Sequence, residues 1–178
     1  MKKFVAAALV TVCMASMVQA AERPSAREVL ETELRDVGVS TFTSATYKPG
    51  LIRHIVLFRY KNGTTEAQRQ EIRNRFVGLA KTATRDGKPY VVSIETGKQS
   101  SGEGVDGGFE EGFIVTFSSE GDRNYYVGTP VVTESRYFDP EHQKFKEFVG
   151  PYLADGGVLV FDFKVTDSIR LGSIVRNK

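Results

Sequence analysis

Two histidines carry most of the chemistry that this sequence could support, because the chain has no others. His54 lies in an apolar stretch whose alternation places it on the same side as Val56 and Phe58. His142 precedes Phe145 by three residues, about one helical turn, and should face inward with it. The two imidazoles could therefore line one pocket between a sheet and a helix. A histidine on an apolar strand face is more often a core residue that hydrogen-bonds to backbone or water, so packing is the alternative.

The sequence before His142 predicts its chemical setting. Asp139-Pro140 is typical of a helix start, because Asp accepts hydrogen bonds from free backbone N–H groups and Pro is tolerated in the first turn. The positive end of the helix dipole disfavours an imidazolium, so we expect the pKa of His142 to be lowered. His142 would then serve as a base or hydrogen-bond acceptor near neutral pH, while His54 could orient a carbonyl group.

Hydrophobic periodicity predicts the elements that must position these residues. We expect strands at 51–60, 90–96, 113–117 and 158–165. One helix should begin after Thr65 and close at Gly87, and a second should run from Pro140 to Gly150-Pro151. A short helical stretch should also open at Asp122. The order β-α-β-β-α-β predicts a ferredoxin-like α+β unit, with an antiparallel sheet and two helices on one face.

The first strand is apolar on both faces, since Ile55 and Leu57 lie between Arg53 and Arg59 on the side away from His54. A sheet covered on one side only would alternate cleanly, so a second subunit is the simplest cover for the other face. Asp162 lies among apolar residues of the last strand. If it is buried it needs a partner, and Arg53 or Arg59 could supply one; a solvated edge position is the alternative.

The first twenty residues resemble a secretory signal. Lys2 and Lys3 precede a short apolar run, and Val18-Gln19-Ala20 is a small-x-small cleavage site. We expect cleavage after Ala20, a periplasmic or secreted protein, and no stable membrane insertion afterwards; an uncleaved anchor is the alternative. The only cysteine, Cys13, lies in this segment, so the mature chain has no thiol.

Without Lys2 and Lys3, the basic residues equal the 22 acidic ones, which argues against nucleic-acid binding through a broad basic field. Residues 21–50 form a leader, in which Ser25 and Glu28 predict a capped helix over 26–36 and residues 38–50 form a linker or packed arm. The domain spans 51–166, and 167–178 form a tail. The glycine-rich stretch 97–108 lacks the Gly-Lys-Ser/Thr ending of a phosphate-binding loop, so we interpret it as a flexible connection.

Four segments, 52–60, 112–117, 140–148 and 158–163, closely resemble the stress-responsive A/B-barrel (Dabb) domain family, over roughly residues 51–165. The resemblance implies a ferredoxin-like unit that dimerises into an α+β barrel. It also implies a more distant similarity to the plant polyketide cyclases of the olivetolic acid cyclase type. That branch uses a His on the first strand, a Tyr before the last helix and a His-Pro-x-His motif.

The resemblance places His54, His142 and Tyr125 on the three functional positions of that branch, with Tyr125 as donor to a developing oxyanion. Asp139 stands in place of the first histidine of the motif, and Glu111 in place of a further histidine at the third strand. We place Val56, Phe58, Phe145, Glu111 and Asp139 in a ligand-binding role. His54, His142 and Glu111 could hold a divalent ion, but their spacing does not demand one, and we expect neither a metal nor a cofactor.

The sequence thus favours an exported dimer that binds a small, partly apolar molecule in the cell envelope. The alternative is a cyclase- or lyase-type enzyme with His142 as general base, assisted by His54 and Tyr125. A purely structural dimer is a third reading.

Overall fold

Strands and helices follow one another in the order that the sequence predicts. The computed structural model describes residues 23–168, so the predicted signal peptide lies outside the described residues, as does most of the predicted tail. The helices are α1 (Ala26–Val37), α2 (Val39–Phe42), α3 (Glu66–Thr82), α4 (Glu120–Val127) and α5 (Pro140–Val149), with single 3-10 turns at Ser135–Tyr137 and Gly150–Tyr152. The strands are β1 (Pro49–Tyr60), β2 (Thr84–Arg85), β3 (Lys88–Pro89), β4 (Ser93–Lys98), β5 (Glu111–Ser119) and β6 (Leu153–Lys164).

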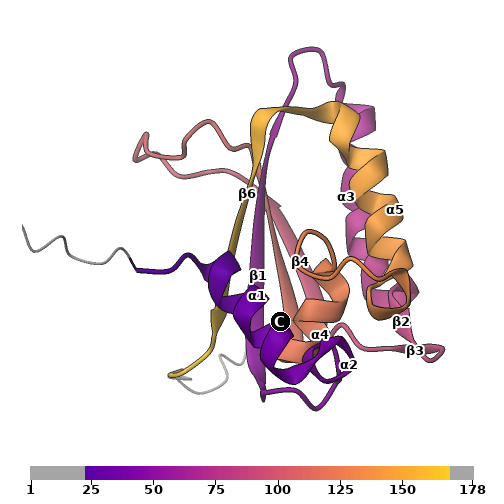
Figure 1. The fold of residues 1–178 in the computed structure, drawn as a ribbon. Coiled ribbons are helices and arrows are strands. Elements are labelled where there is room, and N and C mark those ends of the chain that lie inside the picture. Colours follow the sequence, from indigo (N-terminus) through magenta and orange to yellow (C-terminus); the bar gives the residue numbers. More distant parts are fainter. Residues whose placement is uncertain (1–22, 169–178) are drawn as a thin grey trace, which may run out of the picture.

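Four strands pair in the order β4-β5-β1-β6, and the described ladders are antiparallel. Helices α3 and α5 lie side by side over one face of this sheet, with α4 below them (Figure 1). The core forms where the alternate residues of β1 and β5 meet the apolar faces of these helices, as in the stack of Phe76 on Phe113 with ring centroids 4.1 Å apart. The predicted ferredoxin-like α+β fold is confirmed.

Helix starts agree closely with the sequence, whereas one helix end does not. Both predicted capping boxes form, between Ser25 and Glu28 and between Thr65 and Gln68. Helix α3, however, ends at Thr82 rather than at Gly87. Gly87 instead follows Asp86 in the turn of a small β2–β3 hairpin, and both residues have positive φ. The glycine therefore serves a hairpin turn, which needs the same backbone conformation as a helix end.

The starts of β4 and β6 differ most from the predicted strand boundaries. Strand β4 begins at Ser93, and of the residues expected on one face Tyr90 and Ile94 pack against the core while Val92 is 57% exposed. Strand β6 begins at Leu153 rather than at Val158. Leu153 pairs with Tyr60, and the ladder then shifts register before Val158 pairs with Phe58, so Gly156 and Gly157 lie in an irregular stretch of the strand.

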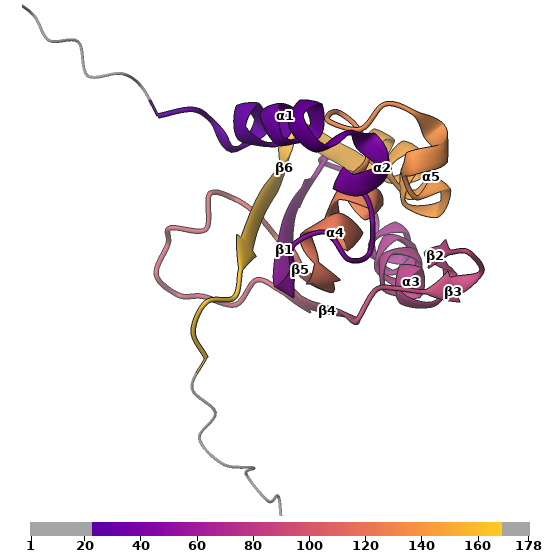
Figure 2. The same ribbon diagram turned by 60° about the horizontal axis from the view of Figure 1, so that its bottom comes forward.

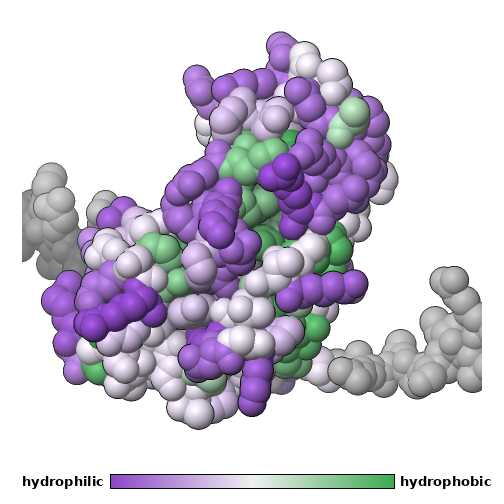
Figure 3. All heavy atoms as spheres, turned by 90° about the vertical axis from the view of Figure 1, so that its right-hand side faces the viewer, coloured by the Kyte–Doolittle hydropathy of each residue, from purple (hydrophilic) through white to green (hydrophobic). Residues whose placement is uncertain are grey.

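The sheet face opposite the helices stays uncovered in the single chain. The alternate residues of β6 on that face, Leu159, Phe161 and Phe163, are 41%, 59% and 41% exposed. The helical side, by contrast, presents a largely hydrophilic surface with smaller apolar areas between (Figure 3). A contiguous apolar sheet face on a folded chain is typical of a surface that another protein covers.

The N-terminal arm, defined here as residues 23–48, packs on the domain rather than forming a free linker. Its helices α1 and α2 lie beside the edge of the sheet near β6 and close to α4 (Figure 2). Phe42 is only 1% exposed, and the Tyr47 hydroxyl donates to Glu33 at 3.1 Å. Within residues 23–168, no helix is long and apolar enough to cross a bilayer.

Candidate functional site

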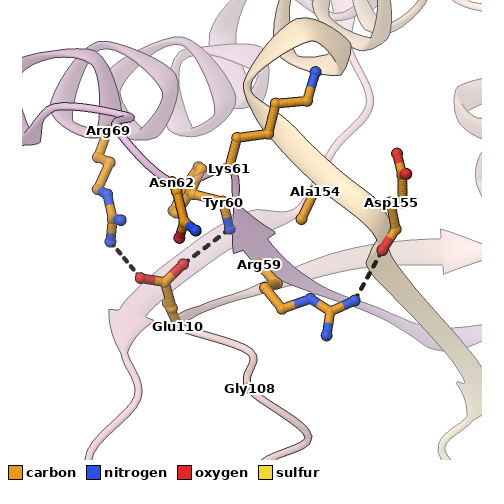
Figure 4. Close-up of a pocket in the computed structure, with 9 residues that line it drawn as sticks. All are labelled: Arg59, Tyr60, Lys61, Asn62, Arg69, Gly108, Glu110, Ala154 and Asp155. Atoms are coloured by element: carbon orange, nitrogen blue, oxygen red, sulfur yellow. Dashed lines mark hydrogen bonds and ion pairs between the residues drawn. The ribbon is translucent and has the colours of Figure 1, made fainter.

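Several hollows in the described residues have the volume of a small molecule. The first is lined mainly by polar residues that already pair with protein groups, although the buried Arg59 Nε has no partner there. It has a volume of about 590 Å³ and lies where the end of β1 meets the start of β6. Arg69 pairs with Glu110 at 2.6 Å, Glu110 accepts from the Tyr60 backbone N–H, and Arg59 donates to the Asp155 carbonyl at 2.8 Å (Figure 4). None of the residues that the sequence singled out for a site lies here.

The second hollow, which we call the histidine cavity, has a volume of about 380 Å³ and lies between the sheet and α5. His54 from β1 and His142 from α5 both line it, together with Val56, Phe58 and Phe145. Val158 and Val160 of β6 complete its wall, and because β6 is an edge strand they are 47% and 53% exposed. The cavity is therefore an apolar hollow with two imidazoles in its lining, bordered by the outer strand of the sheet.

His54 is held by a carboxylate on the neighbouring strand. It lies directly opposite Asp162 in the β1–β6 ladder, so the two side chains share the inner face. Asp162 Oδ1 lies 2.7 Å from His54 Nδ1, and its Oδ2 accepts from Arg123 Nη1 at 2.6 Å. Burial opposes ionisation of Asp162, but the hydrogen bonds and charges of His54 and Arg123 outweigh it, and the pKa of Asp162 is lowered. Asp162 is thus a carboxylate held between two cationic or proton-donating groups.

His142 has a neutral partner instead. Its Nδ1 lies 2.6 Å from the backbone carbonyl oxygen of Tyr126, and its ring stacks on the Tyr126 ring with centroids 3.8 Å apart. Burial, reinforced by the charges of Lys146 and His54, lowers the pKa of His142 to about 3. His142 is therefore neutral across the physiological range, as the sequence predicts, although burial is the main cause rather than the helix dipole.

Both partners fix which imidazole nitrogen carries a proton. A carbonyl oxygen only accepts, so His142 Nδ1 must donate to Tyr126, and an ionised Asp162 imposes the same role on His54 Nδ1. Neither Nε2 atom makes a hydrogen bond within the described residues. On neutral imidazoles those Nε2 atoms are lone-pair acceptors, available to a molecule in the cavity.

Lys146 adds a third polar group to the cavity lining. Its ammonium donates to the carbonyls of Val127 and Thr129 and to the Thr129 hydroxyl, at 3.1, 3.4 and 3.0 Å. Burial lowers the pKa of Lys146. These bonds connect α5 to the end of α4 and leave the lysine engaged with the protein itself.

The sequence matches the family model of the stress responsive A/B barrel domain over residues 52–165. That match covers more than half of the chain. The protein belongs to the stress-responsive A/B-barrel family. No curated protein sequence matches this chain.

Three solved structures share this fold at low sequence identity. The hydroxynitrile lyase of Passiflora edulis has a TM-score of 0.53 at 20% identity, covering 68% of this chain and 99% of its own. The protein At3g17210 of Arabidopsis thaliana has a TM-score of 0.52 at 22% identity, covering 67% and 99%. A dimeric ferredoxin-like protein of unknown function from Jannaschia sp. CCS1 reaches 0.50 at 19% identity, covering 65% and 100%. At these identities the likeness concerns the fold.

The tyrosine expected from the A/B-barrel resemblance lies outside the histidine cavity. The Tyr125 ring packs under the Arg85 guanidinium, 4.4 Å from its centroid, and meets Tyr90 edge-on. Its neighbour Tyr126 is the one that contacts both imidazoles, with its ring 6.0 Å from that of His54. Successive helical residues point about 100° apart, so a shift of one residue moves the tyrosine from one side of α4 to the other. The assignment of Tyr125 to the site is therefore wrong.

Glu111 is also remote from the histidines. It is buried at the start of β5, where it accepts from the Tyr60 hydroxyl at 2.7 Å and pairs with Arg73. Within residues 23–168, no three His, Cys, Asp or Glu side chains are grouped so that they could hold a metal ion, and the set of His54, His142 and Glu111 does not come together. Glu111 fastens α3 to the sheet and does not line the histidine cavity.

Asp139 does not line the histidine cavity but holds the backbone of His142, which does. One of its oxygens accepts from the backbone N–H groups of Glu141 and His142, and the other accepts from the Tyr90 hydroxyl at 2.7 Å. It therefore fixes the first turn of α5, and with it the backbone of His142.

The sequence reasoning missed Arg123, Tyr126 and Lys146, and it gave Asp162 the wrong partners. Arg53 and Arg59 project from the opposite face of the strand: Arg53 contacts Thr116 and Arg59 contacts Asp155. Strand alternation could have shown this, because only even-numbered residues of β1 share a face with His54. Arg123 had no such signal, since its contact with Asp162 spans 39 residues.

Proposed function

We propose that this protein is exported and, as a homodimer, binds a small, partly apolar molecule in the histidine cavity. One observation carries the proposal: two imidazoles, each with Nδ1 occupied and Nε2 unbonded, line a single apolar hollow of about 380 Å³. That volume falls in the usual range for small-molecule sites, which are mostly apolar with a few placed polar groups.

The tautomers define the chemistry of the ligand. On neutral imidazoles the two unbonded Nε2 atoms accept hydrogen bonds, so the ligand should present hydroxyl or N–H donors beside an apolar body. A carboxylate only accepts hydrogen bonds, and the unprotonated Nε2 of neutral His142 has no proton to donate to it. We therefore favour phenols and hydroxylated aliphatic or aromatic molecules.

A thermal-shift comparison tests this ligand class. Simple phenols and hydroxyalkyl-benzenes should raise the melting temperature of the mature protein, because a ligand that binds only the folded state stabilises it by mass action. The matched methyl ethers, which lack the donor, should raise it less. His142→Phe should reduce the difference between each phenol and its ether, because only the His54 acceptor remains. A panel in which no compound shifts the melting temperature, or in which ethers equal phenols, contradicts the proposal.

Dimerisation is supported by the uncovered sheet face, on which Leu159, Phe161 and Phe163 are exposed. The Jannaschia structure of the same fold is described as dimeric. Phe161→Glu places a charge in the middle of this face and should convert the dimer into a monomer by light scattering. Lys144→Glu, on the exposed side of α5, is the matched control. If Phe161→Glu and Lys144→Glu are both monomeric, or both dimeric, the result contradicts this interface.

Export is supported by the charged start, apolar run and cleavage pattern of residues 1–20. Expression of the full chain in a bacterium should yield a periplasmic protein whose intact mass begins at Ala21. A full-length cytoplasmic protein would contradict export.

A second candidate, proton-transfer catalysis, is favoured by the His54–Asp162 hydrogen bond of 2.7 Å. A carboxylate behind an imidazole holds its tautomer and stabilises the imidazolium that forms when Nε2 takes a proton. In such a lyase, Nε2 of His54 removes a substrate hydroxyl proton, the oxygen forms a carbonyl, and the adjacent carbon–carbon bond breaks with release of a carbanion. His54 suits the role of general base better than His142, because a group with a pKa near 3 is a weak base at neutral pH.

The Passiflora neighbour is named a hydroxynitrile lyase, so cyanohydrins are reasonable probes of this second candidate. Release of benzaldehyde from mandelonitrile, above the buffer rate, should occur with the unmodified protein and fall at least tenfold in His54→Gln. Tyr125→Phe should retain full activity, since Tyr125 lies outside the cavity. Release no faster than in buffer removes this candidate for cyanohydrins and leaves the binding proposal in place.

A further inference from the structure

One short helix orients both histidines. From α4, Arg123 donates to Asp162, which in turn holds His54 Nδ1, at 2.6 and 2.7 Å. Three residues further along the same helix, the Tyr126 carbonyl accepts from His142 Nδ1 and its ring stacks on the imidazole. Any displacement of α4 would therefore move the supports of both imidazoles together.

Helix α4 is in turn seated on the N-terminal arm. Its first backbone N–H groups, of Glu120 and Gly121, donate to the carbonyls of Lys48 and Tyr47 at 3.3 and 3.1 Å. The approach is close: a Cβ on Gly121 would lie 1.8 Å from the carbonyl oxygen of Ser44. Only glycine fits between α4 and the arm at this point.

A second contact connects the arm to the series of hydrogen-bonded side chains that ends at His54. Asn124 is 4% exposed, and its amide donates to the backbone carbonyl of Phe42 at 2.8 Å. Its Oδ1 accepts from Arg123 Nε at 2.9 Å. A continuous series of hydrogen bonds thus leads from the α2 backbone through Asn124, Arg123 and Asp162 to His54.

The arm also brings a charge toward Arg123. Glu33 of α1 is fixed by Lys48 at 2.6 Å and by the Tyr47 hydroxyl, and the positive charge of Arg123 helps to lower its pKa although burial opposes this. The arm precedes residues 52–165, which the family model matches. The structural alignments with the Passiflora and Arabidopsis proteins span 99% of those chains but only 68% and 67% of this one. The arm is therefore an addition to the shared fold.

We infer that the N-terminal arm is a working part of the site: it seats α4 and thereby sets the orientation and proton position of both His54 and His142. This inference rests on the proposed function for its significance, since it explains how the cavity presents two Nε2 acceptors. Its structural content stands without a ligand. Arg123 and Asn124 are positioning residues that act through Asp162, and the arm acts through them.

The test compares glycines in two helices of the full chain, labelled with ¹⁵N-histidine and measured at pH 8. Gly121→Ala forces α4 away from Ser44, whereas Gly78→Ala in α3 adds a Cβ with nothing within 4 Å. We expect the imidazole ¹⁵N shifts of the Gly78→Ala protein to match the unmodified protein, with the proton of each ring on Nδ1. In Gly121→Ala both histidines should lose that pattern and show mixed tautomers.

Gentler variants keep the test informative if Gly121→Ala does not fold. Asn124→Ala removes the bond to Phe42 and should alter both histidines, whereas Arg123→Gln should alter His54 and spare His142. Arg123→Lys, which keeps the charge beside Asp162, should restore most of the His54 pattern. Folded Asn124→Ala protein with both imidazoles unchanged would overturn the inference. Because no ligand is used, a failed ligand screen would count against the proposed function and not against the arm.

Discussion

His54 and His142 use the same nitrogen for support, yet their surroundings differ in charge. His54 Nδ1 meets a carboxylate that Arg123 holds in place, whereas His142 Nδ1 meets a backbone carbonyl in the buried core. The carboxylate can stabilise an imidazolium, while the carbonyl and the apolar surroundings keep the second ring neutral. The difference teaches that two histidines of one cavity can rest on supports of different charge, one a carboxylate and the other a neutral backbone carbonyl.

The largest expected effect is the pH dependence of stability caused by His142. Its pKa is about 3 in the folded protein against about 6.5 when unfolded, so below pH 6.5 the unfolded chain binds a proton that the folded chain does not. Stability should therefore fall as the pH drops from 6.5 to 3, by about 1.4 kcal/mol per pH unit and ~5 kcal/mol in all.

Urea unfolding between pH 7 and pH 4.5 measures this slope. The upper part of the range avoids Asp162, whose lowered pKa contributes stability that is lost only at more acidic pH. His142→Gln, which can still donate to the Tyr126 carbonyl, should be less stable at pH 7 but show a slope smaller by about 1.4 kcal/mol per pH unit. Equal slopes would mean that His142 is not a buried neutral group.

The next effect concerns the carboxylate that distinguishes His54. Asp162→Asn should cost about 2 kcal/mol at pH 7, less than the ~3–5 kcal/mol of a fully buried pair, because the Asp162 side chain is 22% exposed. The loss arises mainly from the Arg123 charge, which is left without its partner. Arg123→Met alone should cost a similar amount, and the double variant should cost less than the sum of the two. Strict additivity in denaturant unfolding would show that the two residues do not interact.

The smallest effect is expected at the Tyr126 ring, which contacts both imidazoles. The Tyr126 hydroxyl is buried and has no hydrogen-bond partner within the described residues, so Tyr126→Phe removes an unsatisfied group while keeping the stack on His142. Stability should be unchanged or rise by about 1 kcal/mol. A thermal melt of the variant beside Tyr125→Phe checks this, and a loss above 1 kcal/mol would indicate a hidden partner for the Tyr126 hydroxyl.

Local patterns predicted the fold and part of the site well. The alternation of β1 placed His54 beside Val56 and Phe58, and the spacing from Phe145 placed His142 on the inner side of α5, as observed in the cavity lining. These features depend on a strand period of two and on a helical turn, which the sequence carries directly.

The remaining features depend on contacts that local patterns do not contain. Gly87 has the backbone conformation that both a helix end and a hairpin need, so its element could not be inferred from residue type. Tyr125 and Tyr126 are adjacent, so the resemblance alone did not tell which of them faces the histidines. The partnership of Arg123 with Asp162 arises only when α4, seated on the arm, packs against β1 and β5, so that Arg123 reaches β6.

The central claim is that both Nε2 atoms face one ligand, and imidazole NMR tests it most directly. With only two histidines in the chain, ¹⁵N-labelled protein gives two ring systems that single substitutions assign. On titration with a phenol that raises the melting temperature, we predict that the Nε2 signals of His54 and His142 move together, with one dissociation constant, while both Nδ1 protons stay in place. Movement of one ring alone, or of neither while the phenol still binds, would contradict a shared ligand site.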